Sequence, residues 1–211
     1  GVNSPTARLE GNALTVSASV TIASGDTLDA ATNNLNLSVG GHWLNLGTYS
    51  AGNNTTTFNG SSAQTMSGTV FNNLIINNAA GVSMLSGQTV NGTLTLAAGT
   101  FGVGSNTLIL NGAITSTGGS LSSATNGTVN YNKSSNGQAV LAANYGNLTF
   151  SNFNKVLPSS GTVGIAGTLT TGTATGHTIA NSTIDFNGSG AQTIPAFNYN
   201  NLTISGDRAG A

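Results

Sequence analysis

Short runs of alternating apolar and polar residues are the main pattern along this 211-residue chain. Examples are Leu94-Thr95-Leu96 and Leu202-Thr203-Ile204, in which every second side chain is apolar. A period of two predicts strands that bury one face. Gly, Asn and Ser fill the intervals, as expected for turns, and the good helix formers Glu, Lys, Arg, Gln and Met are scarce. The pattern therefore predicts an all-β protein of many short strands.

One sequence block, here called the A block, occurs three times. Each copy has an aromatic-Asn start, a Gln in the middle and an aromatic-x-Asn-Leu run at its end. The copies read TFNGSSAQTMSGTVFNNLIINN from Thr57, NYNKSSNGQAVLAANYGNLTFSN from Asn130 and DFNGSGAQTIPAFNYNNLTISG from Asp185. The recurring aromatic residues predict two stacked structural ladders, one of Phe58, Tyr131 and Phe186 and one of Phe71, Tyr145 and Tyr199.

A second block, the B block, alternates with the A block. It has a TLTL-like strand, a small-residue turn and a second short apolar strand, and it begins at Val16, Val90 and Ile165. The order along the chain is B, A, B, A, B, A. We expect one solenoid domain over residues 1–211, with coil blocks at about 16–46, 57–85, 86–114, 130–157, 158–182 and 183–211.

Two all-β architectures compete for this pattern. Six Asn-Gly pairs, from Asn59-Gly60 to Asn187-Gly188, favour hairpins and hence an antiparallel β-sandwich. Irregular copies of a short-strand unit instead favour a parallel β-solenoid of about ten coils, in which each coil buries its inner face by stacking on the next. We favour the solenoid. It predicts the following inward side chains: Leu74, Ile76, Leu94, Leu96, Leu108, Leu110, Leu148, Leu169, Leu202 and Ile204.

Composition and charge exclude several classes of partner. Asn, Thr, Ser and Gly make up 114 of the 211 residues, and only nine residues are charged, with a net charge of -1. This charge provides no basic field for nucleic acid or anionic lipid, and no apolar run approaches the ~18 residues of a membrane span. Cysteine is absent, so there is no disulfide framework and no thiolate metal site.

The sequence TFNGSSAQTMSGTVFNNLIINNAAGV, followed by VNGTLTLAAGTFGVGSNTLILNG, resembles the repeat region of long surface and secreted proteins of Gram-negative bacteria. These are the haemagglutinin-like β-solenoid adhesins, many of which are exported by type IX secretion. The resemblance covers most of the chain from about Val16 onward. It implies an extracellular, parallel β-solenoid with a structural or adhesive role, and its motifs are specific to the repeat style rather than to any activity.

Candidate catalytic and metal-binding residues are few. Asp26 and Asp29 lie close together and could share one calcium ion, although a turn capped by Asp side chains explains them better. His42 and His177 have no nearby carboxylate, which argues against a triad or a zinc site. Lys133 and Lys155 could form isopeptide bonds to Asn, but no partner acid is evident. We therefore expect no enzyme, no metal and no cofactor.

Two binding functions remain as alternatives. Threonine arrays on a flat solenoid face could order water, as in ice-binding proteins, and the sequence contains Thr93-Leu94-Thr95, Thr168-Leu169-Thr170 and Thr55-Thr56-Thr57. Carbohydrate binding needs exposed aromatic rings, for which Trp43 and Tyr49 are candidates. A structural position for Trp43, either in the core or covering an end of the solenoid, is the better interpretation.

The two termini of the sequence are complementary in the repeat order, because it begins with a B block and finishes with an A block. This order predicts that copies of the chain stack head to tail as structural subunits of an extracellular bacterial fibre or adhesin stalk. The partner is then the chain itself, with surface glycans or other cells as further partners. The residues expected at the junction are Arg8, Glu10, Asn201, Leu202, Ile204, Asp207 and Arg208. A fragment of one longer solenoid polypeptide would give the same junction.

Overall fold

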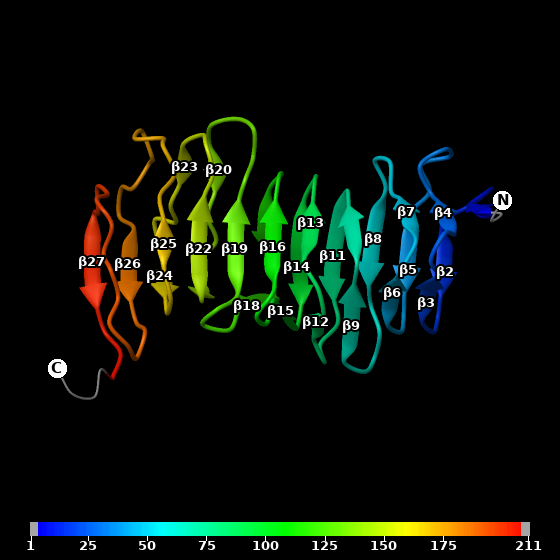
Figure 1. The fold of residues 1–211 in the computed structure, drawn as a ribbon, viewed down its shortest axis with the longest axis horizontal. Helices are drawn as coiled ribbons and strands as arrows, with labels where there is room; N and C mark the ends of the chain where they lie inside the picture. The colour runs from blue at the N-terminus through cyan, green and yellow to red at the C-terminus, as the bar shows by residue number, and fades with distance from the viewer. Residues whose placement is uncertain (1–3, 208–211) are drawn as a thin grey trace. The chain divides into compact units, whose positions relative to one another are not determined.

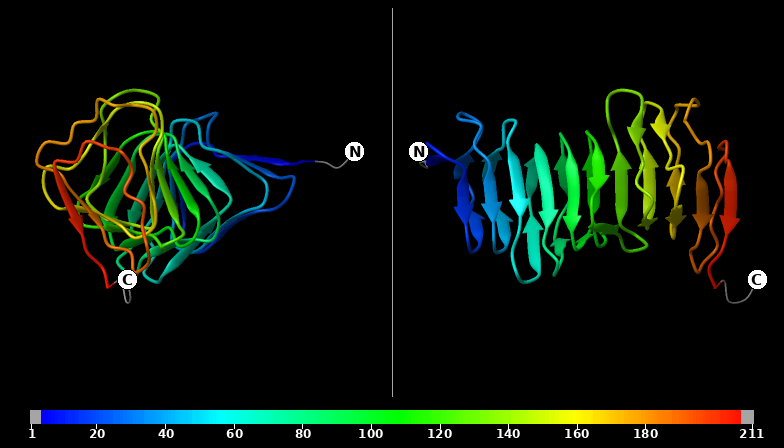
Figure 2. Two further views of the ribbon diagram at one scale, coloured as in Figure 1. Left: turned by 60° about the vertical axis from the view of Figure 1, so that its left-hand side comes forward. Right: turned by 180° about the vertical axis from the view of Figure 1, so that it is seen from behind.

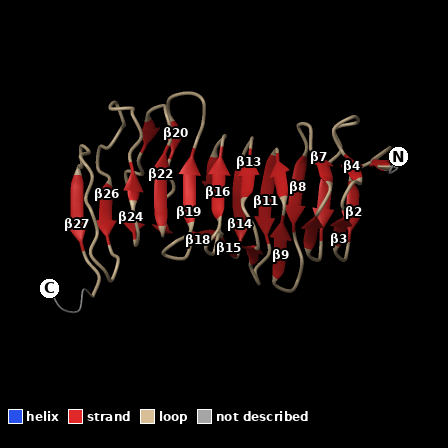
Figure 3. Cartoon of the chain, viewed as in Figure 1, coloured by secondary structure: helices blue, strands red, loops and turns tan. Residues whose placement is uncertain are grey.

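The computed structural model describes residues 4–207, in which it has 27 short strands and no helix (Figure 3). The strands pair in parallel and stack as a β-solenoid of about ten turns. This confirms the predicted solenoid and excludes the antiparallel sandwich. The six Asn-Gly pairs all lie between strands, and none of them joins an antiparallel hairpin.

The described chain divides into two compact units, each of which is a stack of parallel strands (Figure 1). Unit 1 comprises residues 4–102 and 115–120. Its first sheet is β1 (Thr6–Arg8), β4 (Thr27–Asp29) and β7 (Thr48–Ser50). Its second sheet is β2 (Leu14–Val16), β5 (Leu37–Val39), β8 (Thr55–Phe58), β11 (Asn73–Asn77), β14 (Leu94–Ala98) and β17 (Ile114–Ser116). In β17, Thr115 and Ser116 belong to unit 1. Its third is β3 (Val20–Ile22), β6 (Trp43–Asn45), β9 (Gln64–Ser67), β12 (Val82–Met84) and β15 (Thr100–Gly102), and β10 (Thr69–Phe71) pairs with β13 (Gln88–Val90).

Unit 2 comprises residues 103–114 and 121–207 and repeats the same arrangement. One sheet contains β16 (Thr107–Leu110), β19 (Thr128–Tyr131), β22 (Asn147–Phe150) and β25 (Leu169–Thr170). Another contains β18 (Ser120–Ser122, of which Leu121 and Ser122 belong to unit 2), β21 (Asn144–Tyr145), β24 (Thr162–Ile165), β26 (Thr183–Phe186) and β27 (Asn201–Ile204). A short pair is formed by β20 (Gln138–Ala139) and β23 (Lys155–Val156). In Figure 2 the blue-to-cyan strands of unit 1 and the yellow-to-red strands of unit 2 each follow in chain order.

Each turn takes 17 to 23 residues, as the pairings Gln138↔Lys155 and Leu14↔Leu37 illustrate at the two limits. Because a parallel register stacks like positions, inward side chains form continuous apolar columns. Leu74 pairs with Leu94 and Ile76 with Leu96, and all four side chains are fully buried. Of the predicted inward residues, Leu108, Leu110, Leu148 and Leu169 are buried as well.

Two predicted inward side chains are not buried. Leu202 and Ile204 are 43% and 59% exposed. They continue the inward column, since Leu202 pairs with Ile184 and Ile204 with Phe186, both of which are buried. Their prediction as core residues was wrong because burial needs a turn on both sides, and in the described chain β27 pairs with β26 alone.

Each A block forms one full turn of the solenoid, so its first and last strands are neighbours. The starting aromatic residue therefore pairs in register with an apolar residue of the closing strand: Phe58 with Ile76, Tyr131 with Phe150, and Phe186 with Ile204. Because the block is one turn long, its two aromatic rings enter the same layer of the core.

The predicted aromatic ladders are therefore wrong. Tyr131 lies on β19 and Phe186 on β26, which belong to different sheets of unit 2. Each starting ring instead contacts the second ring of its own block, edge to face. The ring centroids are 6.1 Å apart for Phe58–Phe71, 6.3 Å for Tyr131–Tyr145 and 6.3 Å for Phe186–Tyr199. Such contacts stabilise aromatic pairs beyond their area burial.

Candidate functional site

The predicted calcium candidate is an internal cap. Asp29 accepts hydrogen bonds at 3.0 Å from the Thr32 backbone N–H and at 2.6 Å from its hydroxyl, and Arg8 Nε lies 3.1 Å from Asp29 Oδ2. The Thr32 hydrogen bonds, together with the Arg8 charge, lower the pKa of Asp29 from 3.8 to about 2. Its oxygens are therefore occupied without a metal ion. Within residues 4–207 no group of three or more His, Cys, Asp or Glu side chains could hold one.

Each histidine accepts a hydrogen bond from a backbone N–H of a neighbouring turn. The Thr65 N–H lies 3.1 Å from His42 Nδ1, and the Lys155 N–H lies 3.0 Å from His177 Nδ1. His177 Nε2 is 2.9 Å from the Ala174 carbonyl oxygen, which fixes the neutral tautomer with the proton on Nε2. Burial lowers the pKa of His177. With both ring nitrogens engaged, His177 has no lone pair for a metal ion or for proton abstraction.

Lys155 is fully buried, and its Nζ donates a hydrogen bond of 3.0 Å to the Ser151 carbonyl oxygen. Burial, with a smaller effect of the Lys133 charge, lowers the pKa of Lys155. Lys155 forms no ion pair within the described residues. The geometry therefore provides no carboxylate for an isopeptide bond to this lysine.

The aromatic residues considered for carbohydrate binding are in the core. Trp43 is 1% exposed, and its Nε1 donates to Thr69 Oγ1 at 2.7 Å. Tyr49 packs on it at a centroid distance of 4.9 Å and is 8% exposed. Neither ring can stack on a sugar at the surface.

The Thr-x-Thr pairs do not lie on successive strands. Thr55 and Thr57 lie on β8, and Thr95 lies on β14, but the intervening β11 carries Asn73 and Ile75 at these outward positions. Thr168 and Thr170 lie next to Asn147 and Thr149 of the preceding turn, so this Thr-x-Thr pair also has no second Thr-x-Thr pair beside it on β22. The outward surface is thus a mixed array of Thr, Asn and Ile.

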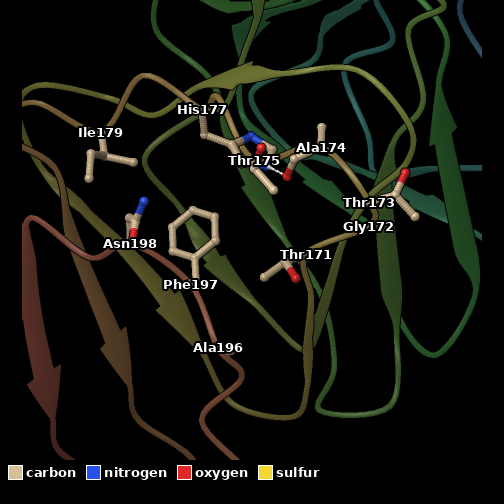
Figure 4. A pocket seen from close by; sticks show the side chains of 10 residues that line it. All are labelled: Thr171, Gly172, Thr173, Ala174, Thr175, His177, Ile179, Ala196, Phe197 and Asn198. Atoms are coloured by element: carbon tan, nitrogen blue, oxygen red, sulfur yellow. Dashed lines mark hydrogen bonds between the residues drawn. The ribbon is translucent and has the colours of Figure 1, made fainter.

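A pocket of about 310 Å³ lies in unit 2 beside two segments that form no regular strand (Figure 4). Phe197 contacts His177 at a centroid distance of 5.3 Å. The lining residues are Thr171, Gly172, Thr173, Ala174, Thr175, His177, Ile179, Ala196, Phe197 and Asn198. The lining contains no carboxylate or lysine, and its histidine is occupied, so the pocket lacks an acid–base pair.

The Gln in the middle of each A block has a role that the sequence did not reveal. Gln138 Nε2 donates to the carbonyl oxygens of Leu110 at 2.8 Å and Gly112 at 2.7 Å, and its Oε1 accepts from the Lys133 N–H at 3.1 Å. Gln64 and Gln192 bind the preceding turn in the same way. This side chain ties one turn to the preceding turn by side-chain hydrogen bonds that add to the backbone ladder, as at Leu110, whose carbonyl oxygen also accepts from the Asn132 N–H.

The second A block also contains a closed ring of hydrogen bonds. The Leu141 N–H donates to Tyr131 Oη at 3.0 Å, and the Tyr145 hydroxyl donates to the Leu141 carbonyl oxygen at 2.7 Å. The two hydroxyl oxygens are 2.7 Å apart, so Tyr131 donates to Tyr145. Burial raises the pKa of Tyr131 to about 12 and that of Tyr145 well above 10.

The predicted junction residues lie at two sheet edges. Asn201, Leu202 and Ile204 are exposed on β27, and Asp207 follows them, also exposed. Arg8 lies on β1 and Glu10 shortly after it, both exposed. Arg8 contacts Asp29 within the chain. Arg208 lies outside the described residues.

A feature that the sequence did not reveal is an apolar opening beside β2 and β3 in unit 1. It is an open depression of about 350 Å³, to which Leu14, Val16, Val20, Ile22 and Leu28 contribute apolar side chains. Val20 and Leu14 remain partly exposed, although they pair with the buried residues Trp43 and Leu37. In the described chain β2 and β3 each pair on one side alone.

No protein-family model matches the chain, and comparisons with curated proteins and with solved structures give no significant match. Residues 4–207 contain no helix that could cross a membrane.

Proposed function

We propose that this chain is a non-enzymatic structural subunit of an extracellular bacterial fibre or adhesin stalk, with copies stacked head to tail. The observation that carries the proposal is the exposed inward column on β27. Leu202 and Ile204 hold core positions by register yet are 43% and 59% exposed. An exposed edge strand with free backbone groups and apolar side chains binds another strand readily.

The remaining chemistry supports a structural role. The pocket in unit 2 has no acid–base pair, and the Asp29 carboxylate is bound by Thr32 and Arg8. Nine charged residues in 211 leave little repulsion between stacked copies. A contact between two different surfaces of the same chain propagates as a filament when its rotation does not close a ring. The extracellular bacterial setting rests on the resemblance of the repeats to β-solenoid adhesins.

Electron microscopy and sedimentation of the purified chain test this function. A variant with a charged, Pro-containing segment appended after Ala211 serves as the matched control. We expect filaments from the native chain at high concentration and folded monomers from the capped variant, because charge and Pro block pairing at a strand edge. If both chains are monomeric at the same high concentration, the fibre proposal is wrong, and a stalk formed within one longer polypeptide replaces it.

A further inference from the structure

The two exposed edges match each other in backbone hydrogen-bonding groups. The Val20 N–H donates to the His42 carbonyl oxygen, and the Leu46 N–H donates to the Ile22 carbonyl oxygen. In a parallel ladder alternate residues direct their backbone groups to opposite sides. Since Val20 and Ile22 face β6, the N–H and C=O of Thr21 face the open side of β3.

On β27 the inward residues, not the outward ones, direct their backbone groups to the open side. The Asn201 N–H donates to the Ser182 carbonyl oxygen and the Ser205 N–H to the Phe186 carbonyl oxygen, so these residues face β26. The backbone groups of Leu202 and Ile204 therefore face the open side. A parallel partner residue placed between them, opposite Thr203, can donate to Leu202 and accept from Ile204.

The side chains select the same alignment. Val20 pairs with the buried Trp43 and therefore points inward, as does Ile22, which is 5% exposed. Leu202 and Ile204 hold inward positions with the same spacing of two. Placing Leu202 next to Val20 and Ile204 next to Ile22 buries all four side chains, whereas a shift of two residues leaves one apolar side chain on each strand without its counterpart.

We propose that β27 of one copy pairs in parallel with β3 of a second copy, with Leu202 beside Val20, Thr203 beside Thr21 and Ile204 beside Ile22. This inference rests on the proposed head-to-tail function and specifies its contact. The apolar opening beside β3 then receives the Leu202 and Ile204 side chains, and the two threonines extend the outward face across the junction.

Because the chain has no cysteine, introduced thiols report this register directly. In the double variant Thr21→Cys and Thr203→Cys, both thiols lie on exposed outward positions that the pairing brings opposite each other. Leu44→Cys with Thr203→Cys is the matched control, since Leu44 is also outward and exposed but lies one strand further away on β6. Circular dichroism establishes that both variants are folded.

Mild oxidation followed by non-reducing electrophoresis gives the result. We expect a ladder of reducible oligomers from the Thr21/Thr203 pair and at least about tenfold less from the Leu44/Thr203 pair. A third variant adds Ile204→Asp to the first pair; it should lose the ladder while staying folded, because Ile204 is already 59% exposed.

The outcomes separate this contact from the function on which it rests. Filaments without a Thr21/Thr203 ladder, or equal ladders from both pairs, would overturn the β27–β3 register and leave the fibre function standing. A chain that forms neither filaments nor ladders at high concentration would overturn both.

Discussion

At the residue scale, polar side chains buried in the core hold the turns in register. Gln138 is 1% exposed and binds two carbonyl oxygens of the preceding turn, 26 and 28 positions earlier in the chain. Buried carbonyl groups need hydrogen-bond donors, and the amide adds one donor to Gly112 and a second donor to Leu110, which also accepts from the Asn132 N–H.

We expect Gln138→Glu to lower the free energy of unfolding by about 2–4 kcal/mol at pH 7, because a carboxylate then faces two carbonyl oxygens in a buried site. Urea unfolding followed by circular dichroism measures the loss. Gln192→Glu is the control: it faces the equivalent carbonyl oxygens of Ile165 and Gly167 but is half-buried, so its effect should be smaller. Unchanged unfolding of Gln138→Glu would show that the amide does not fix the register.

The Tyr131–Tyr145 pair predicts a loss of stability in alkali. Burial raises the pKa of Tyr131 from 10.0 to about 12 in the folded chain. Unfolded tyrosine ionises first, so the contribution of the pair is complete below pH 10 and is lost as the pH rises from 10 through 12. Denaturant unfolding at pH 7, 9, 10 and 11 should show a plateau followed by a fall.

Tyr131→Phe removes the acceptor of the Leu141 N–H and should lower the free energy of unfolding by about 1–3 kcal/mol at pH 7. It should also make the alkaline fall shallower. Tyr199→Phe is the control, since the Tyr199 hydroxyl donates to the Pro195 carbonyl oxygen from a half-buried position. Identical alkaline profiles for Tyr131→Phe and the unmodified chain would exclude the pair as their cause.

At the scale of strands and corners, glycine sets how closely consecutive turns approach. Gly99 has a φ of +72°, and a Cβ at this position would lie 1.8 Å from the Asn78 carbonyl oxygen of the preceding turn. Gly11 has a similar φ of +79° but no atom within 4 Å of the same position. An alanine at Gly11 would therefore suffer backbone strain alone, whereas an alanine at Gly99 would suffer backbone strain and steric overlap.

We therefore expect Gly99→Ala to lower the free energy of unfolding by about 2–4 kcal/mol and Gly11→Ala by about 1 kcal/mol. Thermal or urea unfolding of the two variants provides the comparison. Equal losses in the free energy of unfolding would mean that the turns move apart at Gly99 at little cost. Close stacking of the turns would then not be the reason for a glycine at this position.

The strands also show how far the sequence could predict the structure. Alternation predicted the inward residues from Leu74 to Leu169, because burial in a stacked interior depends on local period alone. It failed for Leu202 and Ile204, whose burial needs a neighbour that the strand itself does not specify. The aromatic ladders failed because the repeat interval does not reveal the turn length, and the Gln138 contacts were missed because their partners are distant in sequence.

At the scale of the whole molecule, the scarcity of charge follows from the parallel register. Like positions of successive turns lie about 4.8 Å apart, so a charge that recurred in every turn would repel itself along a column. Thr and Asn avoid this penalty and hydrogen-bond between turns, as the Thr168 hydroxyl does when it donates to Asn147 Oδ1 at 2.8 Å. In the proposed fibre, the same property would reduce the repulsion between turns that stack at β27.

The one-turn A block has a consequence for how such chains change length over generations. Tyr131 and Phe186 mark successive copies 55 positions apart, and at about 20 residues a turn this interval is about two and three-quarter turns. Recombination between the two copies would remove or duplicate that interval. The strands that follow would then join different sheets, because β19 and β26, which begin the two copies, lie in different sheets. We therefore expect a rearrangement between these two A blocks to move the outward residues of later turns to other faces, while the pairing within a block, such as Phe186 with Ile204, is kept.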